Sequence, residues 1–372
     1  MRLEDTTMRH KTLLVLFAAV LPLDGGAAHA RAAVAESTPT VALESTMVPR
    51  VRGGEVREVG LAGSLAETLQ QVGSRERGPL WFAWEVAATP SLGNSCCFDD
   101  KFRGCACRLE AKNQSWGSQD KRPGSGRELV LARWSNGAVE RVRGFSSTCE
   151  LDTGGLLLVH LTGVQPADSV ALLEDLARRP SEKRHGDSEP LAVLAYHAGR
   201  AADEALHRLA GTDRSIDDRD QPLFWIGQAR GEEGARFLAG VAYHDPSPDI
   251  RQKAIFSLSQ NDGPSAVPAI IDVAKTDHDP EVRSQALFWL AQSGAEQAPK
   301  VILARLDDDP SLEVRKQAVF AITQLKDHQS VPLLMRIARE PRDREIRQQA
   351  LFWLGQSTDP RAIDFFAKIL GQ

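Results

Sequence analysis

The residues whose types and spacing best fit chemistry are five cysteines close together in the first half of the chain: Cys96, Cys97, Cys105, Cys107 and Cys149. Clustered thiols act as disulfide crosslinks, zinc ligands or redox groups. No pair has the C-x-x-C spacing of a zinc site. We therefore expect two disulfides with one thiol left over. Because a bridge between adjacent residues is strained, Cys96 and Cys97 should each pair elsewhere.

Catalysis has little support in the sequence. Cys149 and His160 are the only neighbouring thiol and imidazole, and closeness along the chain does not place them in contact. The Cys105-Ala106-Cys107 motif leaves a thiol redox role open. Nucleophile-elbow, zinc-protease, P-loop and dinucleotide motifs are absent. We predict a non-enzymatic protein with no catalytic residues, no metal and no cofactor, and keep redox chemistry as an alternative.

The first thirty residues have the pattern of an export signal. Basic Arg9 and Lys11 precede an apolar run over residues 13–21, and Ala28-His29-Ala30 matches the small-residue site at which such signals are cleaved. The prediction is a signal peptide over 1–30, a flexible leader over 31–50, and a secreted bacterial protein in the periplasm or outside the cell. Disulfide bonds fit that oxidising location.

Charge and composition exclude two broad classes of protein. The chain has 45 Lys and Arg against 50 Asp and Glu, for a net charge of −5, so it lacks the basic surplus of a nucleic-acid binder. No apolar run after the export signal is long enough for a membrane span. With 42% hydrophobic residues, the mature chain should fold into packed domains.

Residues 51–165 have the signals of a small β-rich, cysteine-containing module. Runs over 80–86 and 129–134 are rich in branched and aromatic residues, and 155–161 forms another apolar run. Asn136-Gly137 predicts a tight hairpin into a strand over 139–143, whose imperfect alternation fits a sheet edge. A helix over 61–72 could cover one face of the sheet, and the cysteines should lie in the loops between strands.

The rest of the chain, residues 166–372, contains an internal repeat of thirty-two residues. The segment 282–292, Val-Arg-Ser-Gln-Ala-Leu-Phe-Trp-Leu-Ala-Gln, recurs in related form at 250–260, 314–324 and 346–356, with a fifth copy at 219–228. Each copy has helical periodicity, and a second apolar helical segment separates one copy from the next. Helix pairs of this size bury their apolar faces only by stacking on neighbours. We predict an α solenoid of about six units.

These residues resemble HEAT-like repeats of the short bacterial type, with Asp-Pro in the turn within each unit and Val-Arg or Ile-Arg opening the second helix. The resemblance covers about residues 168–372 and implies an armadillo-like α/α superhelix. It also implies that the repeated arginines are structural and tie adjacent units together; they are Arg251, Arg283, Arg315 and Arg347.

Two repeated side chains could form a recognition surface. Projected on a helical wheel, Phe288 lies away from the stripe that faces its paired helix, and the same position recurs in every copy. The candidate partner-binding residues are Phe224, Phe256, Phe288, Phe320 and Phe352, together with Gln260, Gln292, Gln324 and Gln356. Packing of each Phe against the neighbouring unit is the alternative. The next position alternates Trp225, Ser257, Trp289, Ala321 and Trp353, which indicates interdigitation in the core.

The function predicted from these patterns is an exported, non-catalytic scaffold whose solenoid binds a protein or peptide. Phycobilin lyase subunits share the repeat type, so a lyase-like enzyme is an alternative. Deoxyhypusine hydroxylases of similar repeats hold iron with His-Glu pairs, but none of the nine His here precedes a Glu. We expect no nucleic acid and no membrane span after signal cleavage. Self-association is possible because Gly371-Gln372 directly follows an apolar helix without a polar cap.

Overall fold

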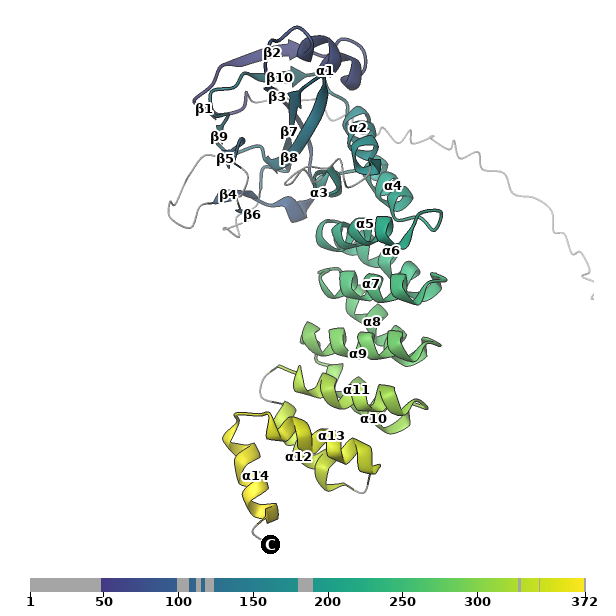
Figure 1. Ribbon diagram of the computed structural model, residues 1–372. Helices are drawn as coiled ribbons and strands as arrows, with labels where there is room; N and C mark the ends of the chain where they lie inside the picture. Colours follow the sequence, from purple (N-terminus) through teal and green to yellow (C-terminus); the bar gives the residue numbers. More distant parts are fainter. Residues whose placement is uncertain are drawn as a thin grey trace, which may run out of the picture. The chain divides into compact units, whose positions relative to one another are not determined.

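A computed structural model describes residues 48–98, 107–111, 115–117, 124–179, 190–326, 329–340 and 342–370 (Figure 1). The predicted signal peptide, most of the predicted leader and Cys105 lie outside these residues. No helix in the described ranges is long and apolar enough to cross a membrane.

A five-stranded sheet lies at the centre of the N-terminal region. Its strands, in spatial order, are β2 (Val56–Gly60), β10 (Leu158–Thr162), β3 (Leu80–Ala87), β7 (Arg127–Ser135) and β8 (Ala138–Ser146). β10 runs parallel to both neighbours, whereas β3, β7 and β8 are antiparallel. The strands predicted near 80, 129, 139 and 155 are all present, and β8 lies at the sheet edge.

The turn between β7 and β8 is the predicted two-residue hairpin. Asn136 and Gly137 have φ angles of 55° and 79°, the left-handed region in which Asn and Gly are the favoured residues. The turn fixes the register by pairing Ser135 with Ala138. The register then shifts once, between Arg133 and Trp134, so that Val139 and Val142 of β8 both pack on the helix-covered face.

Helices cover one face of the sheet. The predicted helix over 61–72 forms as α1 (Leu65–Gly73), which begins at a capping box: the Ser64 hydroxyl accepts from the Glu67 N–H, and the Glu67 carboxylate accepts from the Ser64 N–H. Leu65 and Leu69 of α1 join Phe82 and Trp84 of β3 in one buried cluster. This cluster continues into the helical repeats, so the sheet face and the first repeats share one core.

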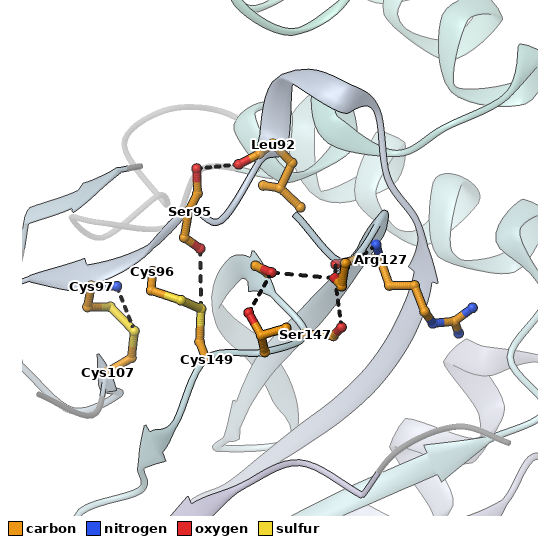
Figure 2. Close-up of a disulfide and its surroundings, with 11 residues drawn as sticks. Leu92, Ser95, Cys96, Cys97, Cys107, Arg127, Ser147 and Cys149 are labelled. Carbon is orange, nitrogen blue, oxygen red and sulfur yellow. Dashed lines mark hydrogen bonds between the residues drawn. A yellow bond between two sulfur atoms is a disulfide. The ribbon is translucent and has the colours of Figure 1, made fainter. Parts of the chain in front are cut away.

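The other face of the sheet is covered by a disulfide-linked layer. Three short strands, β1 (Val51–Arg52), β9 (Leu151–Asp152) and β5 (Cys107–Arg108), form a small parallel sheet, and β4 (Cys96–Phe98) pairs with β6 (Ser115–Gly117). Cys96 is bonded to Cys149 and Cys97 to Cys107, with Cα–Cα distances of 5.6 and 5.0 Å (Figure 2). Adjacent Cys96 and Cys97 thus pair apart, as predicted. The placement of the cysteines in loops was wrong for three of them, which lie in β4 and β5.

Thirteen further helices follow within the described residues. From α2 to α13 they pair along the chain as first and second helices, and α14 follows the last pair. A short 3₁₀ turn, η1 (Pro90–Leu92), precedes them in the sheet region. The helices are α2 (Pro166–Arg178), α3 (Pro190–Tyr196), α4 (Arg200–Leu209), α5 (Ile216–Ala229), α6 (Gly231–His244), α7 (Pro248–Ser259), α8 (Ala266–Thr276), α9 (Pro280–Ser293), α10 (Ala298–Asp308), α11 (Leu312–Thr323), α12 (Ser330–Arg339), α13 (Arg344–Gly355) and α14 (Pro360–Leu370).

The repeated sequence motif forms the second helix of each pair. Small and branched residues of these helices are buried at the thirty-two-residue spacing; Ala254, Ala286, Ala318 and Ala350 have no exposed surface. Alanine at the contact lets neighbouring helices approach closely, and the helix pairs bury their apolar stripes only by stacking. The second helices α5, α7, α9, α11 and α13 therefore lie side by side in sequence order (Figure 1).

Candidate partner-binding surface

Arginines hold the second helices in register. The Arg283 guanidinium donates two parallel hydrogen bonds to the Asp309 carboxylate, both 2.9 Å long, and a third of 2.8 Å to the Asp277 carbonyl oxygen. Asp277 follows the first helix of the same unit, and Asp309 follows the first helix of the next. Each guanidinium thus joins the turns of two successive units with a rigid fork.

Arg251 and Arg315, thirty-two residues on either side of Arg283, also pair with an aspartate, but Asp343, the partner of Arg315, stands at the N-cap of α13 and not directly after a first helix. Arg251 pairs with Asp277 at 2.8 Å and is buried. Arg315 pairs with Asp343 at 2.9 Å, but 26% and 52% of these two side chains are exposed. Arg347, the last of the series, is exposed. The preceding copy, at Arg219, also pairs with an aspartate, Asp245.

The electrostatics of the clamp favour the charged form of its carboxylate. Burial of the Asp309 carboxyl acts to raise its pKa, but hydrogen bonds from Arg283 and from the Ser311 N–H outweigh burial. The pKa of Asp309 is therefore held below its ordinary value. The Asp309 carboxylate therefore stays ionised at neutral pH, as a fork–fork ion pair requires.

An aromatic ladder runs across the second helices. Phe224 stacks on Phe256 at a centroid distance of 6.2 Å, and Phe288 stacks on Phe320 at 5.9 Å. Trp289 bridges the two pairs, 4.9 Å from both Phe256 and Phe288. Further ring contacts extend the ladder to Tyr196 and Trp225 at one end and to Trp353 and Phe352 at the other.

The ladder is both packed and accessible. Phe224, Phe256, Phe288 and Phe320 are half-buried, and Phe352 is 55% exposed. The bridging Trp residues are half-buried at the margin of the core, whereas Ser257 and Ala321, at the same position in the intervening units, are buried. A large ring therefore fits beside a small residue in every second unit. Each ring therefore packs against a neighbouring unit and is still partly exposed to solvent.

The repeated glutamines lie four residues beyond each Phe. Gln260, Gln292 and Gln356 are exposed, and Gln324 is half-buried. The Gln292 amide nitrogen donates to the Gln324 carbonyl oxygen at 2.9 Å, which links two successive units. Gln324 also donates to Thr323 at 2.8 Å. Among the described residues, a hydrogen bond between repeated glutamines of successive units thus links Gln292 and Gln324.

A groove of about 660 Å³ opens beside the ladder between α9 and α11. Phe288 and Phe320 lie on its apolar side. Its polar lining includes Gln285 and Gln317, three residues before each Phe, and Glu281 and Glu313, seven residues before. Neither glutamate nor Gln317 was predicted as part of the site, although their thirty-two-residue spacing is the signal that identified the phenylalanines.

Comparison with protein families gives a direct assignment for this region. A model of HEAT repeats matches residues 235–316 and 299–372. Residues 235–372 are HEAT repeats. The helix pairs of the structure have the corresponding architecture, and the HEAT solenoid is preceded by the β-rich region described above. No curated protein matches the chain.

Several solved structures resemble the HEAT solenoid distantly. They include YibA of Escherichia coli, with 20% identity over 54% of this chain and 80% of that one, and a TM-score of 0.31. The complex of CpcE and CpcF of phycocyanin lyase from Nostoc has 20% identity over 52% and 76% of the two chains, and a TM-score of 0.26. Human deoxyhypusine hydroxylase has 16% identity over 54% and 88%, and a TM-score of 0.23.

The cysteine layer has no free thiol among the described residues. Cys149 is bonded to Cys96, so its sulfur is not a thiol that His160 could activate. His160 lies buried in β10, and burial lowers its pKa although Glu58 and Glu85 act to raise it. The layer crosslinks β4, β5 and the turn before β9 against the sheet, as expected for a structural framework.

A buried polar network, which the sequence analysis missed, joins the sheet to the first helices of the solenoid. His197 Nδ1 lies 2.9 Å from Glu128 of β7, and its Nε2 lies 2.8 Å from the Ser169 hydroxyl of α2. The Trp84 indole donates to that hydroxyl at 2.9 Å. Burial raises the pKa of Glu128, although His197 acts to lower it. Ser169, His197 and Glu128 are at most 1% exposed, so this chain of hydrogen bonds ties elements together and has no face for a substrate.

Proposed function

We propose that this protein is an exported, non-catalytic scaffold in which the second-helix surface of the HEAT solenoid binds a protein or peptide. The observation that carries the proposal is the aromatic ladder, whose rings are held by neighbouring units and still reach solvent beside a groove of about 660 Å³. Two disulfides in the β-rich region fit an oxidising compartment.

The surface has the physical features of a preformed binding site. Buried Arg–Asp clamps hold the helices, so little ordering cost arises when a partner binds. Half-exposed rings supply apolar contact at low side-chain entropy cost, and few such anchors carry most of the binding energy of an interface. The glutamine amides around them can donate and accept hydrogen bonds, which orients a bound backbone or side chain.

The test is a crosslinking pull-down from the cell envelope with the mature protein and a variant carrying Gln285→Arg and Gln317→Arg. These substitutions place bulk and charge in the groove without removing a ring from the ladder. A matched control carries Thr276→Arg and Ala304→Arg, which add the same charge at exposed positions on α8 and α10.

The proposal requires a specific protein that wild type and control capture and the groove variant loses. Circular dichroism and melting curves must show that all three proteins are folded. Equal capture by the groove variant would show that the partner binds elsewhere, and an absence of any specific partner in wild type would contradict the scaffold function itself.

A further inference from the structure

A second repeated row of side chains accompanies the aromatic ladder. Seven residues before each Phe stands a carboxylate, and these acidic positions keep the thirty-two-residue spacing through all five copies: Asp217, Asp249, Glu281, Glu313 and Glu345. All five are exposed and lie in the first turn of their second helix. The HEAT solenoid therefore carries an acidic row alongside the aromatic one.

The two rows share one face. Seven residues make almost two complete turns of an α-helix, so residues i and i+7 lie on the same side, about 10 Å apart along the axis. The groove between α9 and α11 places them together directly, since Glu281 and Glu313 line it with Phe288 and Phe320. An occupant that contacts the rings thus passes within reach of the carboxylates.

The middle of the acidic row is available to a partner. Within the described parts of the chain, Asp249, Glu281 and Glu313 form no direct ion pair, although Lys316 is near enough to Glu313 to attract it; Lys316 itself pairs with Glu345 at 2.6 Å. A first-turn carboxylate also stabilises its own helix through the helix dipole. That role leaves the negative charge on the surface, where it favours cationic groups.

We propose that the occupant is an extended segment of a partner protein that places Lys or Arg over the acidic row and apolar side chains over the aromatic ladder. This inference rests on the proposed function. Packed helices lie about 8–10 Å apart, and a polyproline II segment advances about 9 Å in each turn of three residues. One basic and one apolar side chain in every three residues would therefore meet successive units in register.

The test uses a fluorescent fifteen-residue peptide of five Lys-Pro-Leu repeats and measures anisotropy with the mature protein. Control peptides replace Lys by Glu, or shuffle the same residues so that the three-residue period is lost. We expect wild type to bind the periodic basic peptide more tightly than either control, and salt to weaken that binding. A variant with Asp249→Asn, Glu281→Gln and Glu313→Gln should bind about tenfold more weakly, because each exposed charge contact contributes a fraction of a kcal/mol.

A matched variant separates local charge from net charge. Glu233→Gln, Glu296→Gln and Asp308→Asn remove the same charge from exposed positions on or beside the first helices and should leave affinity unchanged. Equal weakening by both triple variants, or no preference for the periodic basic peptide, overturns the inference. In either case the pull-down with the groove variant still reports on the scaffold function separately.

Discussion

The buried clamp between Arg283 and Asp309 leads to the sharpest prediction about stability. Arg283→Met keeps the apolar stem of the side chain and removes the guanidinium. The Arg283 side chain is 9% exposed and that of Asp309 is 0% exposed. The substitution therefore takes two hydrogen bonds from a buried carboxylate, which keeps only the Arg305 guanidinium, 4.0 Å away, and the Ser311 N–H. It also removes the donor to the Asp277 carbonyl oxygen.

The expected loss of stability follows from that burial. Removing one partner of a buried ion pair costs about 3–5 kcal/mol when the remaining charge is left uncompensated. Because Arg305 still lies 4.0 Å from Asp309, we expect a loss at the lower end of that range, about 3 kcal/mol. Arg315→Met is the comparison variant, since it breaks the ion pair of the corresponding arginine one unit later, where the side chains of Arg315 and Asp343 are 26% and 52% exposed. An exposed pair contributes about 0–1 kcal/mol. A second substitution, Asp309→Asn, should recover part of the loss in the Arg283→Met background.

The assay is urea unfolding followed by circular dichroism, with hydrogen exchange to locate the opening. Local measurement matters because a solenoid can unfold unit by unit. Arg283→Met should speed exchange first around the turns that follow α8 and α10. If Arg283→Met and Arg315→Met destabilise the protein equally, burial does not set the strength of the clamp and the reasoning is refuted.

Two further predictions concern the β-rich region. Replacing the Cys96–Cys149 bridge by serines should lower the free energy of unfolding by about 4 kcal/mol, and replacing Cys97–Cys107 should lower it by about 3 kcal/mol. The first bridge costs more to lose because it closes a loop of 53 residues, whereas the second closes one of 10. Denaturant midpoints that rank the two variants in the opposite order would contradict the loop-entropy account. The raised pKa of Glu128 means that its contribution to stability is present below its unfolded pKa of 4.5 and is lost as pH rises through the folded pKa. Glu128→Gln does not titrate at this position, so the stability of the variant relative to wild type should rise between pH 4.5 and 8 in parallel urea titrations. A difference that does not change with pH would contradict the raised pKa.

The parts of the fold that rest on local or periodic signals could be predicted from the sequence. The thirty-two-residue spacing identified the helix pairs, because each unit has apolar residues at the same positions and buries them against its neighbours. Asn136-Gly137 identified the hairpin, since its two residues tolerate the left-handed backbone that the turn requires. Both signals depend on residues close together in the chain.

Features that depend on the assembled fold were not predictable in the same way. Glu128, Ser169 and His197 are widely separated in sequence, and only the packing of β7 against α2 and the end of α3 brings them together. The disulfide pairing likewise depends on how β4 and β5 lie against the sheet. The acidic row also repeats every thirty-two residues. Carboxylates are common in the first turn of a helix because they interact favourably with the helix dipole, so this pattern alone did not indicate a binding surface.

The alternation of Trp with Ser or Ala means that the aromatic ladder repeats every two units. Trp289 contacts Phe256 of the unit before it, and Trp353 contacts Phe320 in the same way. Excision of residues 257–320, which spans two units, would bring Phe256 next to Trp353 and restore an existing ring contact. Excision of 257–288 would instead place Trp225 and Trp289 in neighbouring units. The solenoid should therefore accept changes of length in steps of two units and resist steps of one.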